Sequence, residues 1–589
     1  MDELTTATQL RLRCEELLQL VRGGTDIDVR TILDRVAGLE ARIDDMRVRG
    51  QVGLDRGVHA LATGHADIAV TALTGAYAAF EQYGKAPRLV GDCLTQLARA
   101  HGFLHDDTAK INSLQEALVH YRQWAEDETK YNEFGGAAKQ VETAIALHRS
   151  LIYAGRPEVG ALEEERRSVD PDLWIDRPDL SAQIDAHIDL LRAEAHAARG
   201  NYQGAEDTLV RLAPLDDTLR ADVLATRGFV LASSGRAAEA LGPYTDAADI
   251  YTAAVSRLHR EHQATHGTGG VRDVDELHTA RTVLATCLMN RGAVRGSTKD
   301  HRRAIDDYTG ALRELEQVPF GGVSAARCQL NIATELLQDG DYQGTARMLR
   351  AIEPILETIP ASNVLHAGYL ETSAHLLSSR QLYLESAEHH RQARNSFRSA
   401  GRPEWAARAG INVAASSALA DRGDEHPAGY AARELIPALL YLDQMRFQFP
   451  TVAGRTAWRD TVAGATQLAF ELADGDPTLV SELIEHAINS GTHSATPVPV
   501  NTEGALELRE RIGAVGQPMS ATDASVGDRD FGSGASCLVA GAVLPMHPPP
   551  RLVMPGPDRK VALQGYFELA EIEYGEPLFR STHVVHAYG

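Results

Sequence analysis

Glycine, alanine and tyrosine recur at fixed distances from one another in the middle of this chain. An alanine follows a glycine after 12 residues, a tyrosine follows it after 16, and this spacing occurs twice. The residues are Gly228, Ala240 and Tyr244 in one unit and Gly292, Ala304 and Tyr308 in the other. Two helices that cross closely need small side chains at the crossing and a larger one beside it. The spacing therefore predicts helix–turn–helix units of about 34 residues.

Three more units carry parts of the same pattern. Their residues are Gly200, Tyr202, Ala205 and Leu209 in one unit, Gly340, Tyr342, Thr345 and Leu349 in a second, and Gly57, Gly64, Ala69 and Ala76 in a third. Together these positions resemble the tetratricopeptide repeat family, over roughly residues 50 to 420. The resemblance implies an all-α fold, a right-handed α-solenoid of helical hairpins whose first helices line a concave groove.

The register and the composition divide the chain into parts. Ala205 and Ala240 are 35 residues apart, but Ala240 and Ala304 are 64 apart, which indicates a long loop or a helix extension as an insertion near 257–278. The predicted parts are N-terminal helices that cap the array (1–49), the repeat array (50–433), a helical C-terminal extension (434–491), a flexible Gly/Ser/Pro-rich linker (492–550), and an irregular, proline-rich tail with a short helix (551–589).

Charge and composition exclude several classes of function. The formal net charge is −23, with no long run of Lys or Arg, which disfavours binding to a nucleic-acid backbone. No segment has the roughly 20 apolar residues that a membrane helix needs. The five cysteines are scattered without a CxxC pair, which is typical of reduced thiols, so we expect a cytoplasmic protein.

The extension after the repeats resembles the linker of bacterial proteins in which tetratricopeptide repeats precede a CHAT domain, a caspase-like protease module. The residues that carry this likeness are Arg455, Trp458, Ala469, Glu482, Leu483, Ile484, Glu485 and Gly491. A protease domain of that family needs well over a hundred further residues of strands and helices, as the resemblance implies. Only 98 residues follow Gly491, and no CHAT protease domain is recognisable among them.

Two residue groups could carry chemistry. His493 precedes Cys537 by 44 residues, an order compatible with a cysteine peptidase dyad, but the caspase-type signature around the cysteine is absent. His259, His262 and His266 would share one face of a continuous helix and could bind a metal, but no HExxH motif occurs there and a solvated polar insertion is the simpler explanation. No phosphate-binding loop or nucleophile elbow occurs. We therefore predict no catalytic residue, no cofactor and no metal.

Asparagines recur in the predicted first helices. Asn290, Asn331 and Asn412 lie in corresponding stretches, and Arg291 and Arg327 lie nearby. In peptide-binding members of the repeat family, as the resemblance implies, asparagine at this position bonds a bound peptide. An amide offers both a donor and an acceptor to an extended backbone, and arginine favours an acidic tail.

The sequence thus predicts a non-enzymatic scaffold or adaptor that binds a protein or peptide partner in the concave groove. The resemblance places it in a bacterial signalling or defence complex. One alternative is a regulatory or sensor subunit of a separately encoded caspase-like effector, and another is a cysteine peptidase that uses Cys537 and His493.

Overall fold

The computed structural model describes most of the chain. The described residues are 2–22, 28–84, 86–104, 106–129, 135–153, 160–168, 178–198, 201–212, 216–234, 236–264, 271–319, 321–361, 363–420, 428–445, 452–491, 538–539, 542–543, 551–554, 560–574 and 584–586. Within these ranges nearly all residues are helical, so the predicted all-α solenoid is confirmed. None of the described helices is long and apolar enough to cross a membrane.

Most helices pack in consecutive pairs, each forming a hairpin. The hairpins are α3 (Met46–Ala62) with α4 (Ala66–Tyr83), α5 (Pro87–Phe103) with α6 (Asp107–Thr129), α7 (Gly135–Tyr153) with α8 (Gly160–Ser168), α10 (Pro178–Ala198) with α11 (Tyr202–Arg211), α12 (Asp217–Ser233) with α13 (Ala237–Ala264), α14 (Val271–Ser297) with α15 (His301–Leu315), α16 (Gly322–Gln338) with α17 (Tyr342–Leu356), α18 (Val364–Ser379) with α19 (Tyr383–Ser399), and α20 (Pro403–Ala420) with α21 (Ala428–Met445).

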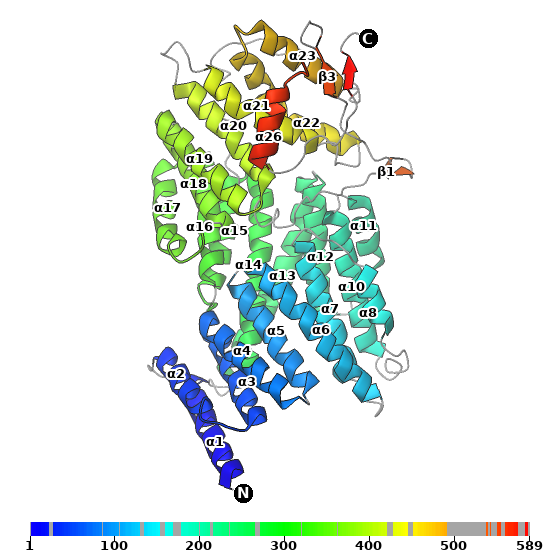
Figure 1. The fold of residues 1–589 in the computed structure, drawn as a ribbon, viewed down its shortest axis with the longest axis vertical. Coiled ribbons are helices and arrows are strands. Elements are labelled where there is room, and N and C mark those ends of the chain that lie inside the picture. The colour runs from blue at the N-terminus through cyan, green and yellow to red at the C-terminus, as the bar shows by residue number, and fades with distance from the viewer. Residues whose placement is uncertain are drawn as a thin grey trace.

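Further elements lie at both ends of the array (Figure 1). They are helices α1 (Asp2–Arg22), α2 (Val29–Glu40), α22 (Val452–Leu472), α23 (Pro477–Gly491) and α26 (Gln564–Tyr574), and strands β1 (Leu538–Val539), β2 (Ala542–Val543), β3 (Arg551–Val553) and β4 (Val584–His586). The first two strands pair antiparallel and the last two pair parallel. These short strands lie in the segments predicted as a linker (492–550) and an irregular, proline-rich tail (551–589), for which no strand pairing was predicted.

The glycine–tyrosine pairs meet where the helices of a hairpin cross. A Cβ placed on Gly292 would lie 2.8 Å from Tyr308 Cε1, and one on Gly228 would lie 2.8 Å from Tyr244 Cδ2. Both tyrosines are buried among the side chains of their hairpins. The predicted role of these residues is confirmed: the absence of a side chain on the glycine creates the space that the ring fills.

Two of the turns are closed by side-chain caps on the second helices, α11 and α17. Asn201 accepts a hydrogen bond from the backbone N–H of Gly204 at 3.1 Å, and Asp341 accepts one from Gly344 at 2.8 Å. Gly340, just before the second cap, has a φ of +83°, which favours glycine. In these two units a polar residue ahead of Tyr-Gln-Gly therefore fixes where the second helix begins.

The irregular spacing between Ala240 and Ala304 comes from long helices. Helix α13 has 28 residues and α14 has 27, whereas α15 has 15. The sequence left open whether the insertion is a long loop or a helix extension. The described residues show that helices extend into it from both sides. Residues 265–270, including His266, lie outside the described part of the chain.

The array curves far enough for distant hairpins to touch. Helix α3 contacts α14, more than two hundred residues later in the chain. A Cβ on Gly64, in the turn after α3, would lie 3.2 Å from the backbone oxygen of Pro319. Figure 1 shows the blue hairpin of α3 and α4 beside the green helices of the middle of the array.

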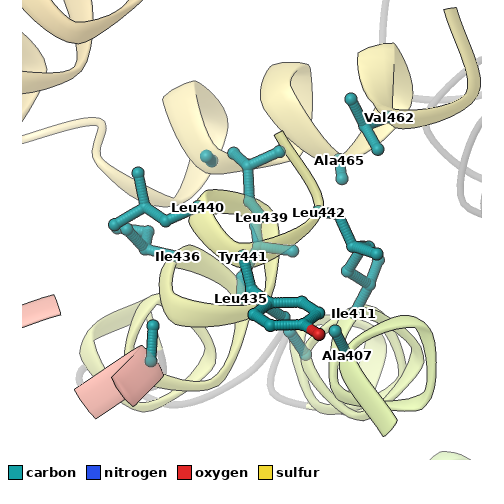
Figure 2. Packing of buried hydrophobic residues seen from close by; sticks show 14 of the residues in the cluster. Ala407, Ile411, Leu435, Ile436, Leu439, Leu440, Tyr441, Leu442, Val462 and Ala465 are labelled. Carbon is teal, nitrogen blue, oxygen red and sulfur yellow. The ribbon is translucent and has the colours of Figure 1, made fainter. Parts of the chain in front are cut away.

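The C-terminal segment packs back on the array. Helix α26 contacts α20 and α21, and Figure 1 shows it lying across them. The Tyr574 ring lies 5.1 Å from that of Tyr441, and a Cβ on Gly410 would lie 2.9 Å from the Tyr574 hydroxyl. Figure 2 shows the apolar cluster around Tyr441, to which α20, α21 and α22 contribute. The tail helix thus completes the core at this end.

Alanine at a glycine that meets a ring should destabilise the array. In Gly292→Ala the new methyl group must displace Tyr308, which costs about 1–3 kcal/mol and outweighs the gain in helix propensity of about 1 kcal/mol. Gly310→Ala is the matched control in the same hairpin, because its Cβ would meet Leu288 at 3.4 Å, an ordinary contact. We expect this control to be neutral or more stable. Urea unfolding of both variants measures the difference.

Truncating the anchor of the tail helix should release it from the array. Tyr574→Ala removes a buried ring and leaves a cavity at Gly410, a loss of about 3–5 kcal/mol for a large side chain. Ile572→Ala, on the same helix with 71 % of the side chain exposed, should have no such effect. Hydrogen exchange of the α26 amides measures the release. Equal protection in both variants would show that Tyr574 does not anchor the helix.

Candidate functional site

The first helices of successive hairpins lie on the inner side of the curve. Helix α10 contacts α12, α12 contacts α14, and α16 contacts α18. Contacts of similar extent between neighbouring second helices are absent from the described helices. Because elements on the inside of a bend lie closer together, the first helices form the concave wall. All five residues predicted to bind a peptide lie on these helices, on α14, α16 and α20.

Arg291 is held inside its own hairpin. Its Nη2 donates to Asp307 Oδ1 at 2.7 Å, and Arg295 Nη1 lies 2.7 Å from Asp307 Oδ2. The carboxylate is only 4 % exposed, so both guanidinium groups neutralise a buried charge. Arg291 and Asp307 are 16 residues apart, the same separation as the glycine–tyrosine pairs, and this spacing could have revealed the ion pair.

Two of the predicted asparagines are buried. Asn331 is 0 % exposed, and neither atom of its amide has a hydrogen-bond partner among the described residues. Asn412 is 3 % exposed, and its Nδ2 donates to Glu371 Oε1 at 3.1 Å. A bound peptide would reach these amides only if neighbouring helices moved apart. Their role in peptide binding stays a prediction.

Asn290 and Arg327 are the accessible members of the predicted set. Both side chains are partly exposed on the first helices α14 and α16. Arg327 has no ion pair with any residue in the described ranges. The guanidinium of Arg327, unlike that of Arg291, is therefore available to an acidic group from outside.

Polar side chains continue along the contacts between first helices. Thr334 Oγ1 lies 3.4 Å from Thr372 Oγ1, which links α16 to α18, and Asn412 links α20 to Glu371 of α18. We call these residues, with Asn331, the polar seam. An unpaired buried amide such as that of Asn331 costs about 1–3 kcal/mol, which an apolar side chain would avoid. Asn331 is thus a costly member of the seam, which packing alone does not explain.

A histidine pair lies beside the polar seam. The rings of His375 and His390 are 4.7 Å apart, edge to face, and one ligand atom from each of them and from Glu371 lies within 4.8 Å of the others. Burial lowers the pKa of His375 to about 3, and burial with the neighbouring His375 and His389 lowers that of His390 well below its usual value. Both imidazoles are neutral at pH 7. The sequence reasoning missed this group, although Glu371 and His375 are spaced one helical turn apart.

The residues proposed for peptidase chemistry cannot be placed. His493 and Cys537 lie outside the described residues. The four described cysteines are buried, and burial raises the pKa of Cys14 to about 11 and those of Cys287 and Cys328 to about 12. These thiols are protonated at neutral pH and are poor nucleophiles.

Replacing Asp307 should leave two arginines unbalanced in the hairpin interior. We expect Asp307→Asn to lower the free energy of unfolding by about 2–3 kcal/mol, somewhat less than for a fully buried pair because both arginines are partly exposed. Asp300→Asn, which breaks an exposed pair with Arg303 in the same hairpin, should cost less than about 1 kcal/mol. Chemical denaturation of both variants measures the difference. Equal free energies of unfolding would mean that the ion pair of Arg291 with Asp307 does not stabilise the hairpin.

Comparison with known proteins identifies no family. No family model and no curated protein matches the chain. Among solved structures, yeast Tom70 is similar at 12% identity and a TM-score of 0.28, over 82% of this chain and 95% of that chain. The Cut9 chain of the APC/C hetero-tetramer Cut9–Hcn1 is similar at 13% identity and a TM-score of 0.22, over 82% and 99% of the two chains. At these scores the overlays carry no argument, so the assignment of the fold rests on the hairpins themselves.

Proposed function

We propose that the chain is a non-enzymatic scaffold that binds a protein or peptide partner along the first helices of its hairpins. The observation that carries this proposal is the contact of first helix with first helix, α10 with α12, α12 with α14 and α16 with α18, together with the exposed or unpaired polar groups of α14 and α16. A stack in which each hairpin is stabilised by its neighbours presents an extended surface. Such a surface suits a large partner better than a small substrate.

The accessible basic side chain on this wall favours an acidic partner segment. Arg327 is partly exposed and has no ion pair in the described part of the chain, whereas Arg291 is engaged by Asp307. Asn290 lies on the neighbouring first helix and offers a donor and an acceptor. We therefore assign Arg327 and Asn290 to the first contact with the partner, and Asn331 and Asn412 to a contact that requires the helices to separate.

Charge reversal on the inner wall should release the partner. We expect Arg327→Glu to weaken binding of the partner by tenfold or more. The new carboxylate would face an acidic segment, and like charges placed opposite one another are strongly unfavourable. Arg347→Glu is the matched control, because Arg347 is exposed on the second helix α17. Both tagged full-length variants are expressed in the native host, and co-purified proteins are quantified by mass spectrometry. Equal losses in the two variants, or none, would contradict binding at the first helices.

A narrower proposal concerns the partner. The resemblance of residues 434–491 to the linker of repeat–CHAT proteins supports a cytoplasmic, bacterial setting and a separately encoded caspase-like effector as the partner. Of the residues that carry the likeness, Ala469 and Leu483 are buried in the terminal core, and the side chains of Arg455 and Trp458 lie outside the described set. Co-expression with a caspase-like protein from the same genome tests this. A stable complex that Arg327→Glu disrupts would support it, and separate elution would remove it.

A further inference from the structure

The hairpin of α18 and α19 breaks the repeat pattern beside its crossing. In three other hairpins a glycine lies 12 residues before a buried alanine of the second helix: Gly57, Gly228 and Gly292 precede Ala69, Ala240 and Ala304. These alanines begin their second helices alike, since each donates its backbone N–H to the carbonyl four residues earlier, and in α19 the residue with that bond is Ser386. The residue 12 positions before Ser386 is the buried Ala374, so this crossing also has a small residue. The residue 16 positions after Ala374 is His390, where two other hairpins have the rings of Tyr244 and Tyr308. An imidazole therefore takes the place of a buried tyrosine ring beside the crossing.

Two helices direct three ligating groups to this crossing. Glu371 and His375 are four residues apart on α18 and so share one face of the helix. His390 comes from α19, which packs antiparallel on α18. One ligand atom from each of the three residues lies within 4.8 Å of the other two. Each hairpin turn brings its two helices together, so the fold itself gathers these groups.

The donor atoms match a transition-metal ion. Nε2 of His375 and Nδ1 of His390 have no hydrogen-bond partner among the described residues, and His390 is 1 % exposed. The carboxylate of Glu371 is fixed by the Nδ2 of Asn412, an orientation that metal ligands commonly need. Two imidazoles and one carboxylate favour zinc over magnesium or calcium, which prefer oxygen ligands.

We propose that Glu371, His375 and His390 bind one divalent transition-metal ion, with Zn²⁺ as the ion tested first. A tetrahedral zinc site has bonds of about 2.0–2.2 Å, so the side chains need to close on the ion by small rotations. Water supplies the fourth ligand. The ion joins α18 to α19, and through Asn412 it also holds α20. Asn412 is shared with the proposed partner contact, but the three ligands are separate from the inner-wall residues Asn290 and Arg327, and metal binding does not depend on the proposed function.

Metal content of the full-length protein tests the proposal. The protein is stripped with a chelator, dialysed against Zn²⁺ and measured by mass spectrometry of the metal, and Co²⁺ is added in parallel to read the coordination from its visible absorption. We expect about one ion per chain and the intense absorption of a tetrahedral Co²⁺ site. His390→Gln and Glu371→Gln should lose the stoichiometric ion. Asn412→Ala should retain binding with about 10–100-fold lower affinity.

Two controls separate this site from other histidines. His389 is the neighbour of His390 in the sequence but does not belong to the cluster. His389→Gln should therefore bind the metal ion like the wild type. The double variant His259→Gln/His262→Gln removes the other histidine group singled out in the sequence and should also keep the ion. Circular dichroism establishes that each variant is folded. If His390→Gln does not fold, the metal affinities of Glu371→Gln and Asn412→Ala test the proposal instead. Glu371→Gln nearly preserves the side-chain volume, and Asn412→Ala reduces it.

Three results would overturn the proposal. The first is wild-type protein that takes up neither Zn²⁺ nor Co²⁺ in stoichiometric amount. The second is unchanged affinity in folded Glu371→Gln or His390→Gln. The third is loss of the ion in the His259→Gln/His262→Gln variant, which would place the metal in the extension of α13 instead.

Discussion

The whole array depends on how closely the two helices of a hairpin approach each other. At Gly228 and Gly292 the backbone of the first helix touches a tyrosine ring from the second, with no side chain between them. This contact sets the distance and the angle between the helices. Those in turn decide where the next hairpin can pack and which face of each first helix points inward. The positions of the inner wall, the polar seam and the histidine pair all depend on this distance and angle between the paired helices.

Much of the fold could be predicted because its decisive contacts are local in sequence. Gly292 and Tyr308 are only 16 residues apart, and a cap such as Asp341 acts on an amide three residues away. The spacing of residue types along the sequence therefore predicts where the helices lie, where they turn and where they cross. The same logic extends to Arg291 and Asp307, whose equal separation places both at one crossing.

The environment of the candidate site could not be predicted in the same way. Burial of Asn331 and Asn412 depends on the neighbouring hairpin, which contributes side chains about 40 residues away, such as Glu371 for Asn412. A sequence shows that an asparagine is on a first helix but not how tightly the next helix covers it. Docking of α26 through Tyr574 is less local still, because its contact with Tyr441 joins residues separated by the segment 492–537, which lies outside the described chain. The short strands near the C-terminus are too brief to give a period.

The contact between α3 and α14 changes how such an array can respond to force or to a partner. An open stack of hairpins behaves as a spring, in which small rotations at each interface add up to a large change of pitch. Where Gly64 meets the turn at Pro319, the first hairpin of the array is held against the sixth. Extension of these six hairpins then requires this contact to break first, so it couples their movements to one another.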